Sequence, residues 1–441
     1  MPKIDMDKFV MTLILNDSIE EKKAIAKKIF AMAYKKGIYP SSIQELYMAR
    51  GRGEVPPTFT VPAINLRVLT YDLAKAIFRV AKKKNSGAFI FEIAKSEMGY
   101  TNQPAIEYTS VVLAAAIKEG WEGPVFIQGD HFQVSAKNFK QDQEKELASL
   151  KALILQAIEA GFYNIDIDSS TLVDLTQKSL KKEQEFNYEA CAKLTHFIRQ
   201  NQPRGVEISV GGEIGEVGSK NSTPEELRAF MEGFRHRLRK GLSGISKISI
   251  QTGTSHGGVV LPDGTIAKVK LDFDTLQNLS KIAREEFGLA GAVQHGASTL
   301  PSEAFGKFPE VGTAEVHLAT EFQNMVYDSS HFPKDLKDRM YDWIRKNLLS
   351  ERKEGQTDEQ FLYSARKKAL GAFKKDIMGL PAGVRNAIAA EIEAKFDFLF
   401  DRLNAGNTKD FVKKYITLKR VISRKRIEIP EGVEISHEGA D

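Results

Sequence analysis

The chain has 441 residues, of which 42% are hydrophobic, and a single cysteine, Cys191. This length fits one dominant domain of roughly 250 to 300 residues with an accessory region, and one cysteine excludes a disulfide framework and thiolate metal sites. The net charge of +5 comes from 63 basic and 58 acidic residues, which are interspersed and therefore lack the basic cluster that nucleic-acid binding needs.

The N-terminus carries neither the basic segment nor the small-residue cleavage site of a signal peptide. No apolar run approaches the ~20 residues of a membrane span. We therefore expect a cytoplasmic protein that binds neither a membrane nor nucleic acid.

Residues 1–57 are predicted to form an N-terminal helical segment that ends in the stretch RGRGEVPP. Eight short apolar or β-branched runs follow, and each is ended by Gly, Asn, Asp, His or a similar polar residue. The runs are FTVPAIN (59–65), AFIFEIA (88–94), PVFIQGDH (124–131), YNIDIDS (163–169), VEISVGGEI (206–214), ISKISIQTG (245–253), AGAVQH (290–295) and TAEVHLAT (313–320).

Stretches with helical periodicity lie between these runs, and TPEELRAFMEGFRHRLRKG opens with a threonine cap and acidic residues. Eight alternations of strand and helix predict an α/β protein with a (β/α)8 TIM barrel over residues 58–332. Residues 333–441 are rich in helix and charge, which predicts a helical C-terminal extension.

The active site of such a barrel lies at the carboxyl ends of its strands. Reactive side chains gather there. They are Asp130 and His131 after the third strand, Asp166 and Asp168 on the fourth, Glu213 on the fifth, His256 after the sixth, His295 after the seventh, and His317 and Thr320 on the eighth.

Three histidines on three separate strand ends, His131, His256 and His295, match the open three-ligand site of catalytic zinc. Zinc there would act as a Lewis acid on a ketose carbonyl and stabilise an enediolate. Asp130, beside a predicted ligand, is the candidate general acid and base. Asp168 and Glu213 are candidates for a second metal site or for partners that orient the histidines.

Small residues and hydroxyls follow the last three strands, where backbone N–H groups can hold an anion. They are Gly257, Gly258, Gly296, Ser298 and Thr320. Their common position predicts a phosphate site.

These segments resemble the class II, metal-dependent ketose-bisphosphate aldolases of the fructose and tagatose type. The resemblance spans roughly residues 58 to 330, and its most specific part is GTSHG followed at the next strand by HGAS. The matching segments are QGDH (128–131), AGFYNIDIDSS (160–170), GGEIGEVG (211–218), IQTGTSHGG (250–258), KLDFDTL (270–276), QHGAS (294–298) and EVHLATEF (315–322).

The resemblance implies that the three histidines bind Zn²⁺ or another divalent metal and that Asp130 exchanges a proton with the C4 hydroxyl. It also implies phosphate contacts from Gly257, Gly296, Ser298 and Thr320, and a substrate contact from Asn65. Some members need a monovalent cation, and the family forms homodimers or larger assemblies. A weaker likeness of residues 361–377 to the family's C-terminal helix makes Arg366 a candidate for a second phosphate.

The sequence also departs from the family pattern. The loop after the fifth strand, VGSKNS (217–222), lacks the usual carboxylate, Ala94 replaces a serine, and His317, a candidate for substrate binding, replaces an asparagine that is usual on the eighth strand. Ala319 matches the tagatose-type branch.

The leading hypothesis is reversible aldol cleavage of a ketose 1,6-bisphosphate to dihydroxyacetone phosphate and an aldehyde phosphate. The missing loop carboxylate and Ala94 motivate a second hypothesis, that the protein is a metal-dependent C4 or C3 epimerase of a ketose or ketose phosphate. A third is a non-catalytic partner subunit of an aldolase, against which the intact metal-like motifs argue.

Overall fold

The computed structural model describes residues 5–215, 220–253, 261, 271–297, 300–421 and 433–438. Eight parallel strands form a closed ring in chain order, because each pairs with the next and the last, β9, pairs with β2. The strands are β2 (Val61–Asn65), β3 (Ile90–Ala94), β4 (Gly123–Gln133), β5 (Asn164–Asp168), β6 (Ser209–Glu213), β7 (Lys247–Ile250), β8 (Ala292–Gln294) and β9 (Glu315–Leu318). The predicted (β/α)8 barrel is confirmed: seven predicted runs each contain one strand, and the run 124–131 lies within the longer β4.

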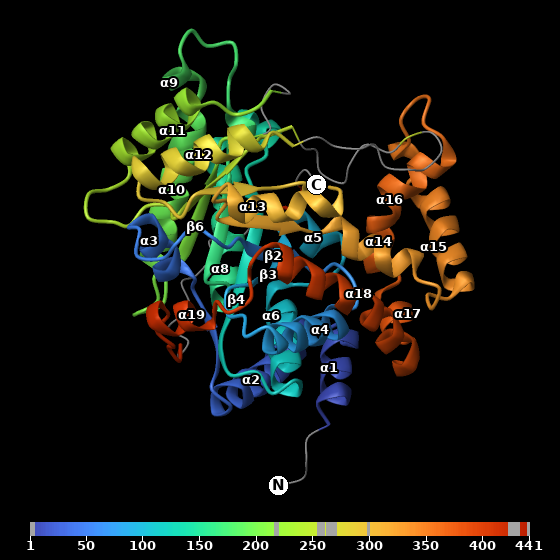
Figure 1. Ribbon diagram of the computed structural model, residues 1–441. Helices are drawn as coiled ribbons and strands as arrows, with labels where there is room; N and C mark the ends of the chain where they lie inside the picture. The colour runs from blue at the N-terminus through green and yellow to red at the C-terminus, as the bar shows by residue number, and fades with distance from the viewer. Residues whose placement is uncertain are drawn as a thin grey trace.

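Helices connect the strands and pack on the outside of the barrel (Figure 1). They include α4 (Thr70–Lys83), α5 (Lys95–Tyr100), α6 (Ala105–Lys118), α7 (Ala136–Gln141), α8 (Gln143–Glu159), α9 (Leu180–Glu183), α10 (Glu185–Asn201), α11 (Pro224–Arg237), α12 (Phe273–Glu285), α13 (Lys307–Glu310) and α14 (Thr320–Asp328). The predicted threonine cap starts α11: the Thr223 hydroxyl accepts from the Glu226 N–H at 3.2 Å, and the Glu226 carboxylate accepts from the Thr223 N–H at 2.8 Å.

Side chains inside the barrel are arranged in levels, because residues of paired strands that share a register point the same way. Ala63, Ile90 and Phe126 share one register and lie in an apolar cluster at the amino ends of the strands, together with Leu46 and Tyr47 of α3 (Gln44–Gly51). The amino end of the barrel is therefore closed by hydrophobic packing.

The next level inside the barrel is charged. Lys247 of β7 is 1% exposed, and its ammonium donates to Gln128 at 2.7 Å and to Glu315 and forms an ion pair with Asp166 at 2.9 Å. Glu315 also accepts from Gln128 at 2.8 Å and from the Tyr47 hydroxyl. Burial lowers the pKa of Lys247, but Asp166 and Glu315 outweigh it and raise the pKa above its ordinary value.

The N-terminal segment consists of α1 (Met6–Leu15), α2 (Ile19–Lys35), α3 and a strand that the sequence did not predict, β1 (Ile38–Ser41). This strand runs parallel to the first residues of β4, from Ile38 opposite Gly123 to Ser41 opposite Phe126. It lies outside the ring, next to the part of β4 that β5 leaves unpaired.

The C-terminal extension is helical, as predicted, and contains α15 (Lys334–Asn347), α16 (Asp358–Ala372), α17 (Lys374–Met378), α18 (Ala382–Arg402) and α19 (Lys409–Tyr415). Figure 1 shows α14 to α17 together at one side of the barrel. Helix α18 packs along α4, where Arg79 pairs with Glu393 at 2.6 Å.

One barrel carboxylate contacts both terminal regions. Glu107 of α6 is 1% exposed and pairs with Lys22 of α2 and, at 2.6 Å, with Lys374 of α17. A single hydrophobic cluster likewise contains residues of all three regions, such as Val10, Ile64 and Phe400. Hydrophobic packing is therefore continuous across the predicted domain boundaries at residues 57 and 332. The division of the chain into three regions stays a prediction.

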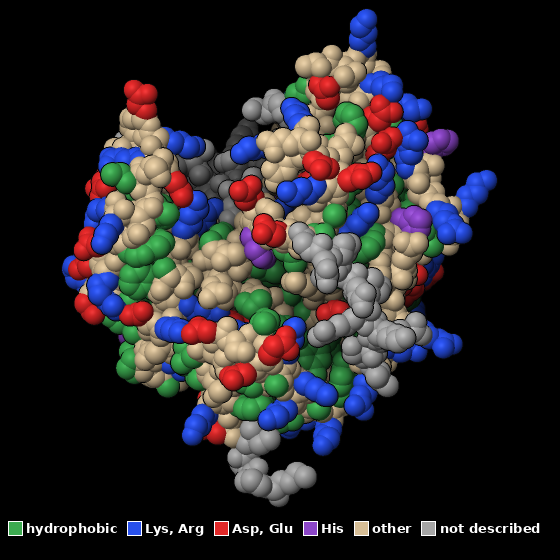
Figure 2. All heavy atoms as spheres, turned by 180° about the vertical axis from the view of Figure 1, so that it is seen from behind, with side chains coloured by type: hydrophobic (Ala, Val, Ile, Leu, Met, Phe, Trp, Pro, Cys, Tyr) green, Lys and Arg blue, Asp and Glu red, His purple; other side chains and the backbone are tan. Residues whose placement is uncertain are grey.

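Acidic and basic side chains are interspersed on the face of the molecule in Figure 2, in keeping with the charge pattern of the sequence. Within the described ranges, no helix combines the length and the apolar character that a membrane crossing requires.

Candidate active site

The end of β4 directs two neighbouring side chains to the same place. Successive strand residues normally face opposite sides, but the pairing of β4 with β5 shifts register between Gly129 and Phe132, and His131 has a positive φ of 39°. A bulge of this kind re-aims a side chain. Asp130 and His131 consequently both face the carboxyl mouth of the barrel, with Asp130 Oδ1 4.0 Å from His131 Nε2.

Imidazoles from three strands meet at this mouth. The ring centroids of His131 and His295 are 4.2 Å apart, and those of His295 and His317 are 4.0 Å apart. Glu213 at the end of β6 places Oε2 3.4 Å from His131 Nδ1. All four side chains are buried. The structure therefore brings together two of the three predicted zinc ligands, His131 and His295.

The third predicted ligand, His256, lies outside the described residues, as do Gly257, Gly258 and Ser298. Among the residues that are described, His131, Glu213 and His295 each offer one ligand atom, and these atoms lie within 4.8 Å of one another. Two imidazoles and a carboxylate are the donor types that a divalent ion such as Zn²⁺ accepts. The donor set thus fits the metal that the sequence predicts.

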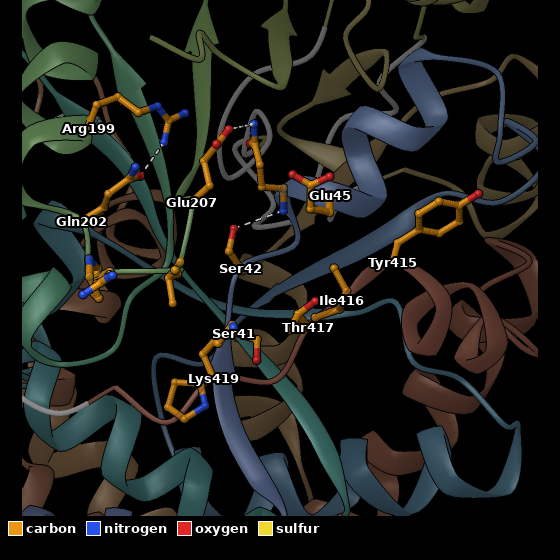
Figure 3. A pocket seen from close by; sticks show the side chains of 16 residues that line it. Ser41, Ser42, Glu45, Arg199, Gln202, Glu207, Tyr415, Ile416, Thr417 and Lys419 are labelled. Atoms are coloured by element: carbon orange, nitrogen blue, oxygen red, sulfur yellow. Dashed lines mark hydrogen bonds between the residues drawn. The ribbon is translucent and has the colours of Figure 1, made fainter. Parts of the chain in front are cut away.

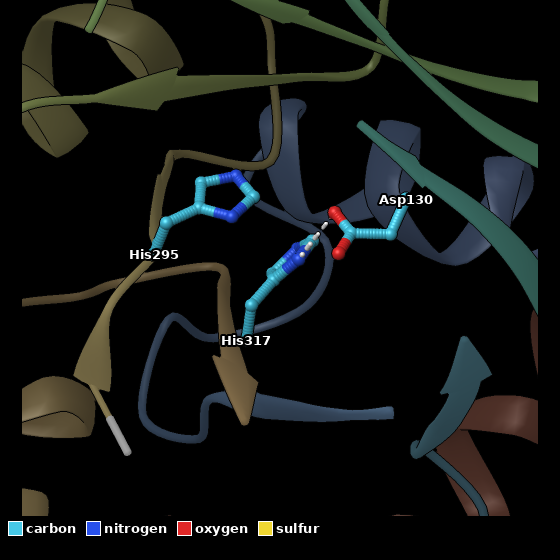
Figure 4. A group of neighbouring side chains, drawn as sticks. All are labelled: Asp130, His295 and His317. Carbon is cyan, nitrogen blue, oxygen red and sulfur yellow. Dashed lines mark hydrogen bonds and ion pairs between the residues drawn. The ribbon is translucent and has the colours of Figure 1, made fainter. Parts of the chain in front are cut away.

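Asp130 lies between this group and the polar side chains of β2 and β9. Its Oδ1 is 3.1 Å from His317 Nδ1, as Figure 4 shows, and its Oδ2 accepts from Asn65 Nδ2 at 3.1 Å. Burial alone would raise the pKa of Asp130, but His131, His317 and His295 together hold it well below its ordinary range. The three imidazoles therefore favour the ionised form of this carboxyl.

The neighbouring carboxylates raise the pKa values of the histidines. Burial lowers the pKa of His131, yet Asp130, Glu213 and Asp168 raise it well above its ordinary value. For His317, Glu92 and Asp130 likewise outweigh burial and raise the pKa. The carboxylates at the mouth therefore favour a positive charge on these two imidazoles.

Asp168 lies behind His131 rather than in the group with Glu213 and His295. Its Oδ2 is 3.3 Å from His131 Nδ1 and accepts from Gln133 Nε2 at 2.6 Å, while Oδ1 accepts from the Ser170 hydroxyl at 2.7 Å. A carboxylate in this position orients the imidazole ring and fixes which nitrogen carries the proton.

The predicted phosphate residues that are described lie at the ends of β8 and β9. Gly296 follows His295 with φ of 66°, and Thr320 is the first residue of α14. Arg67, which the sequence analysis did not single out, donates from Nη1 to the Thr320 hydroxyl at 3.3 Å and from Nε to Glu97 at 2.6 Å. Its position two residues after Asn65, near the end of a predicted strand, could have indicated a site residue in the sequence.

Arg366 is placed among the C-terminal helices. Its guanidinium is 4.5 Å from the ring centre of Tyr363 and 5.1 Å from that of Tyr327, and it donates to Asn324 of α14. These contacts join α16 to α14, so the structure does not bring Arg366 together with the histidines.

A separate cavity of about 720 Å³ opens near the amino ends of the strands (Figure 3). It is lined by the end of β1, by residues before β6 such as Glu207, and by residues 415–419. Its buried Arg199 donates to the backbone oxygens of Ile208, Ser243 and Gly244. None of the predicted site residues in the described ranges lines this cavity.

Comparison with protein families decides the classification. The family model described as fructose-bisphosphate aldolase class II matches residues 57–397. The chain belongs to this family. The predicted resemblance is thereby confirmed, over a longer stretch than the motifs covered.

Similarity to a solved structure supports the fold. A probable tagatose 6-phosphate kinase from Sinorhizobium meliloti 1021 is similar with a TM-score of 0.55 and 15% identity, over 80% of this chain and 99% of that one. Two others match with lower scores. The fructose-bisphosphate aldolase of Campylobacter jejuni has a TM-score of 0.46 and 18% identity, over 82% and 93% of the two chains. The YdjI aldolase of Escherichia coli K12 has a TM-score of 0.44 and 15% identity, over 78% and 99%.

Proposed function

We propose that this class II aldolase family member catalyses the reversible cleavage of a ketose 1,6-bisphosphate, of fructose or tagatose type, to dihydroxyacetone phosphate and an aldehyde phosphate. The observation that carries the proposal is the convergence of His131, His295 and Glu213 beside the ionised carboxylate of Asp130. Metal ligands and a proton acceptor are the two components that aldol cleavage needs in one place.

A divalent ion held by His131, His295 and Glu213, with His256 as a further predicted ligand, would polarise the ketose carbonyl and stabilise the negative charge that develops. Asp130 accepts the proton of the C4 hydroxyl. The C3–C4 bond then breaks, its electron pair remains on C3 as an enediolate, and C4 leaves as an aldehyde. Water supplies the proton that C3 takes up to give dihydroxyacetone phosphate, and Asp130 releases its own proton to solvent. In the reverse reaction Asp130 returns the proton to the new hydroxyl.

Neighbouring side chains prepare Asp130 for this role. Asn65 Nδ2 donates both to Asp130 and, at 2.8 Å, to Glu97, which fixes the orientation of the amide. His317 approaches the other carboxylate oxygen. Two hydrogen-bonded neighbours hold the carboxylate in one position, and positioning within a fraction of an ångström is what proton transfer requires.

Thr320 is the proposed contact of one substrate phosphate. Its hydroxyl accepts from Arg67, whose guanidinium also forms an ion pair with Glu97. Arginine suits phosphate because its N–H groups can donate to two oxygens at once. Gly296 supports the same proposal, because a glycine leaves the backbone N–H groups open to an anion.

His317 supports a second candidate, epimerisation of a ketose or ketose phosphate at C4 or C3. The residue replaces an asparagine of the family and places a second titratable group 3.1 Å from Asp130. Two proton carriers at one carbon are what removal and return of a proton require. In this reaction no triose phosphate is released.

One assay separates the candidates. Zinc-loaded protein is incubated with fructose and tagatose 1,6-bisphosphates and with their 6-monophosphates, and triose phosphate and epimer are measured separately. Triose phosphate from a bisphosphate supports the aldolase, epimer without triose phosphate supports the second candidate, and neither product from any of the four sugars refutes both. As a test of the metal site, His256→Ala should abolish zinc retention and turnover.

We further infer a cytoplasmic enzyme that assembles as a homodimer or larger, because the family resemblance carries that expectation. Sedimentation of the purified protein at micromolar concentration tests the assembly, and a single species of 49.2 kDa would refute it.

A further inference from the structure

The short helix α5 supports two side chains of the proposed site. It begins directly after β3, and its Glu97 is 1% exposed. The Glu97 carboxylate accepts from the Asn65 amide at 2.8 Å and from Arg67 Nε at 2.6 Å. It also accepts from the backbone N–H of Ala94, at the start of the helix, at 2.8 Å. The positions of the Asn65 and Arg67 side chains therefore depend on where α5 lies.

Helix α5 depends on its neighbours for its own position. It has 6 residues, whereas an isolated helix shorter than roughly 12 to 15 residues is marginal in water. Helix α16 packs against its last residue, because a side chain at Gly371 would collide with the backbone oxygen of Tyr100. The described C-terminal residues of the chain provide a second support.

These C-terminal residues, 433–438, lie against α5 through His437. The His437 Nδ1 atom is 3.0 Å from the backbone oxygen of Lys95, and because this oxygen can only accept, Nδ1 carries the hydrogen. The same residue approaches the other end of the helix, where a Cβ added to Gly99 would lie 2.8 Å from the His437 Cβ. One histidine thus contacts α5 near both of its ends.

The segment 433–438 is itself fixed to the barrel. The Ser149 hydroxyl of α8 donates to the backbone oxygen of Glu434 at 2.8 Å and accepts from the Ser436 N–H at 3.0 Å. Between these two residues, Ile435 is partly buried against the main hydrophobic cluster. The segment therefore joins α8 and the core to α5.

We propose that residues 433–438 position α5, and through Glu97 set the orientation of Asn65 and Arg67 in the site. His437 is the positioning residue, because it is the one that contacts the helix. The inference rests on the proposed function, in which Asn65 holds the Asp130 carboxylate and Arg67 holds the Thr320 hydroxyl. The segment acts through α5 and does not itself contact the substrate.

Gly99→Ala tests the contact, because helix propensity and the proposal predict opposite results. Alanine stabilises a helix by about 1 kcal/mol relative to glycine, so an effect confined to α5 would leave turnover unchanged. The added Cβ would instead push α5 and His437 apart. Since a misplacement of about 1 Å can cost about 100-fold in rate, a shift of a few tenths of an ångström should lower kcat/KM for the bisphosphate about 5- to 10-fold.

Further readouts separate positioning from general damage. Both kcat and KM should change, because Asn65 acts on Asp130 and Arg67 acts on Thr320. Zinc content should equal that of wild type, since none of the predicted ligands belongs to α5, and hydrogen exchange of the amides of residues 95–101 should become faster. Wild-type kcat/KM, unchanged exchange of these amides, or a loss of zinc would each overturn the proposal.

Substitutions of His437 in the full-length chain test the residue itself. The amide nitrogen of asparagine is as many bonds from Cβ as Nδ1 is, so His437→Asn can keep the hydrogen bond to Lys95 and should retain kcat/KM within about twofold. His437→Ala loses the bond and should lower kcat/KM about 3- to 10-fold. Lys281→Met, at an exposed position on α12, is the control and should match wild type. An equal loss in both His437 variants, or no loss in His437→Ala, contradicts the proposal.

Failure of the proposed function and failure of this inference give different results. If wild-type protein releases no triose phosphate, the affinity of the zinc-loaded protein for fructose 1,6-bisphosphate, measured by calorimetry, replaces turnover. Weaker binding by Gly99→Ala and His437→Ala then keeps the positioning role and rejects the aldolase, whereas wild-type binding rejects both. Release of triose phosphate at the wild-type rate by both variants keeps the aldolase and rejects the positioning role.

Discussion

Lys247→Met tests whether the charged level inside the barrel is held by one ammonium. The substitution removes the donor to Asp166 and Glu315, two carboxylates that are 6% and 0% exposed. Breaking a buried ion pair by removal of one partner costs about 3 to 5 kcal/mol. Because two carboxylates lose their cation here, we expect the free energy of unfolding to fall by about 4 kcal/mol at pH 8.

The loss should depend on pH in a defined direction. Against the opposing effect of burial, Lys247 and His317 hold the pKa of Glu315 at about 2, whereas burial raises the pKa of Asp166 to about 6 despite Lys247. Without the ammonium both pKa values rise, so the folded variant takes up protons that the unfolded chain releases, and its stability falls as pH increases. The deficit should therefore be smaller at pH 5 than at pH 8, by about 1 to 2 kcal/mol.

Chemical denaturation followed by circular dichroism at the two pH values measures the effect. The double variant Lys247→Met/Glu315→Gln removes a carboxylate with the ammonium and should recover more than about 1 kcal/mol relative to the sum of the two single variants. Lys281→Met serves as the surface control, with a change below about 0.5 kcal/mol. A deficit under about 1 kcal/mol for Lys247→Met, or one that is the same at both pH values, would refute the reasoning.

Three further substitutions test other parts of the structure. Asp130→Asn should lower kcat by about 10²- to 10⁴-fold, the usual contribution of a general acid and base, with zinc content by atomic absorption unchanged; unchanged turnover would exclude Asp130 as the proton carrier. His131→Ala should weaken zinc binding by at least about 100-fold in a competition with a chelator, and wild-type affinity would remove His131 from the ligands. Thr223→Ala should destabilise the protein by about 1 kcal/mol, because α11 loses its cap. Denaturation measures the change against the control Thr417→Ala, a substitution at an exposed position. A change no larger than that of the control would refute the cap.

The barrel was predictable because its strands are short apolar runs, several of which end in polar or charged residues. Asp130, Asp168 and Glu213 each close an apolar run, and the carboxyl ends of parallel barrel strands must meet at one mouth. The sequence therefore located His131 and His295 on the same side of the molecule before any contact was known. Their place on separate strand ends predicted them as metal ligands, and the family likeness implied the same role.

Other features depend on contacts between distant residues, which a run of sequence does not show. The strand β1 has four residues, includes Pro40, and exists through its pairing with residues 123–126. Arg67 and Thr320 are 253 residues apart, so the pairing of a strand-end arginine with a predicted phosphate residue was not visible. In the sequence, Lys247 is a single charged residue in an apolar strand. That its side chain points into the barrel follows only from the closure of the ring of strands.

The orientation of Asp130 and His131 has a similar origin. Neighbouring strand residues are expected on opposite faces, so the sequence could place the pair at the strand end without showing how both reach the site. The register shift in β4 provides the answer, and it arises from the pairing with β5 rather than from a local turn signal.

The position of Glu107 affects how the chain can be shortened. This buried carboxylate faces one lysine from each end of the protein, Lys22 and Lys374. A truncated chain that lacks α2 removes Lys22 and leaves Lys374 paired with Glu107, and one that lacks α17 does the reverse, so each deletion changes the environment of the opposite terminus. Deletions from the two ends should therefore have non-additive effects on stability, and expression boundaries for this protein are best chosen with both termini kept.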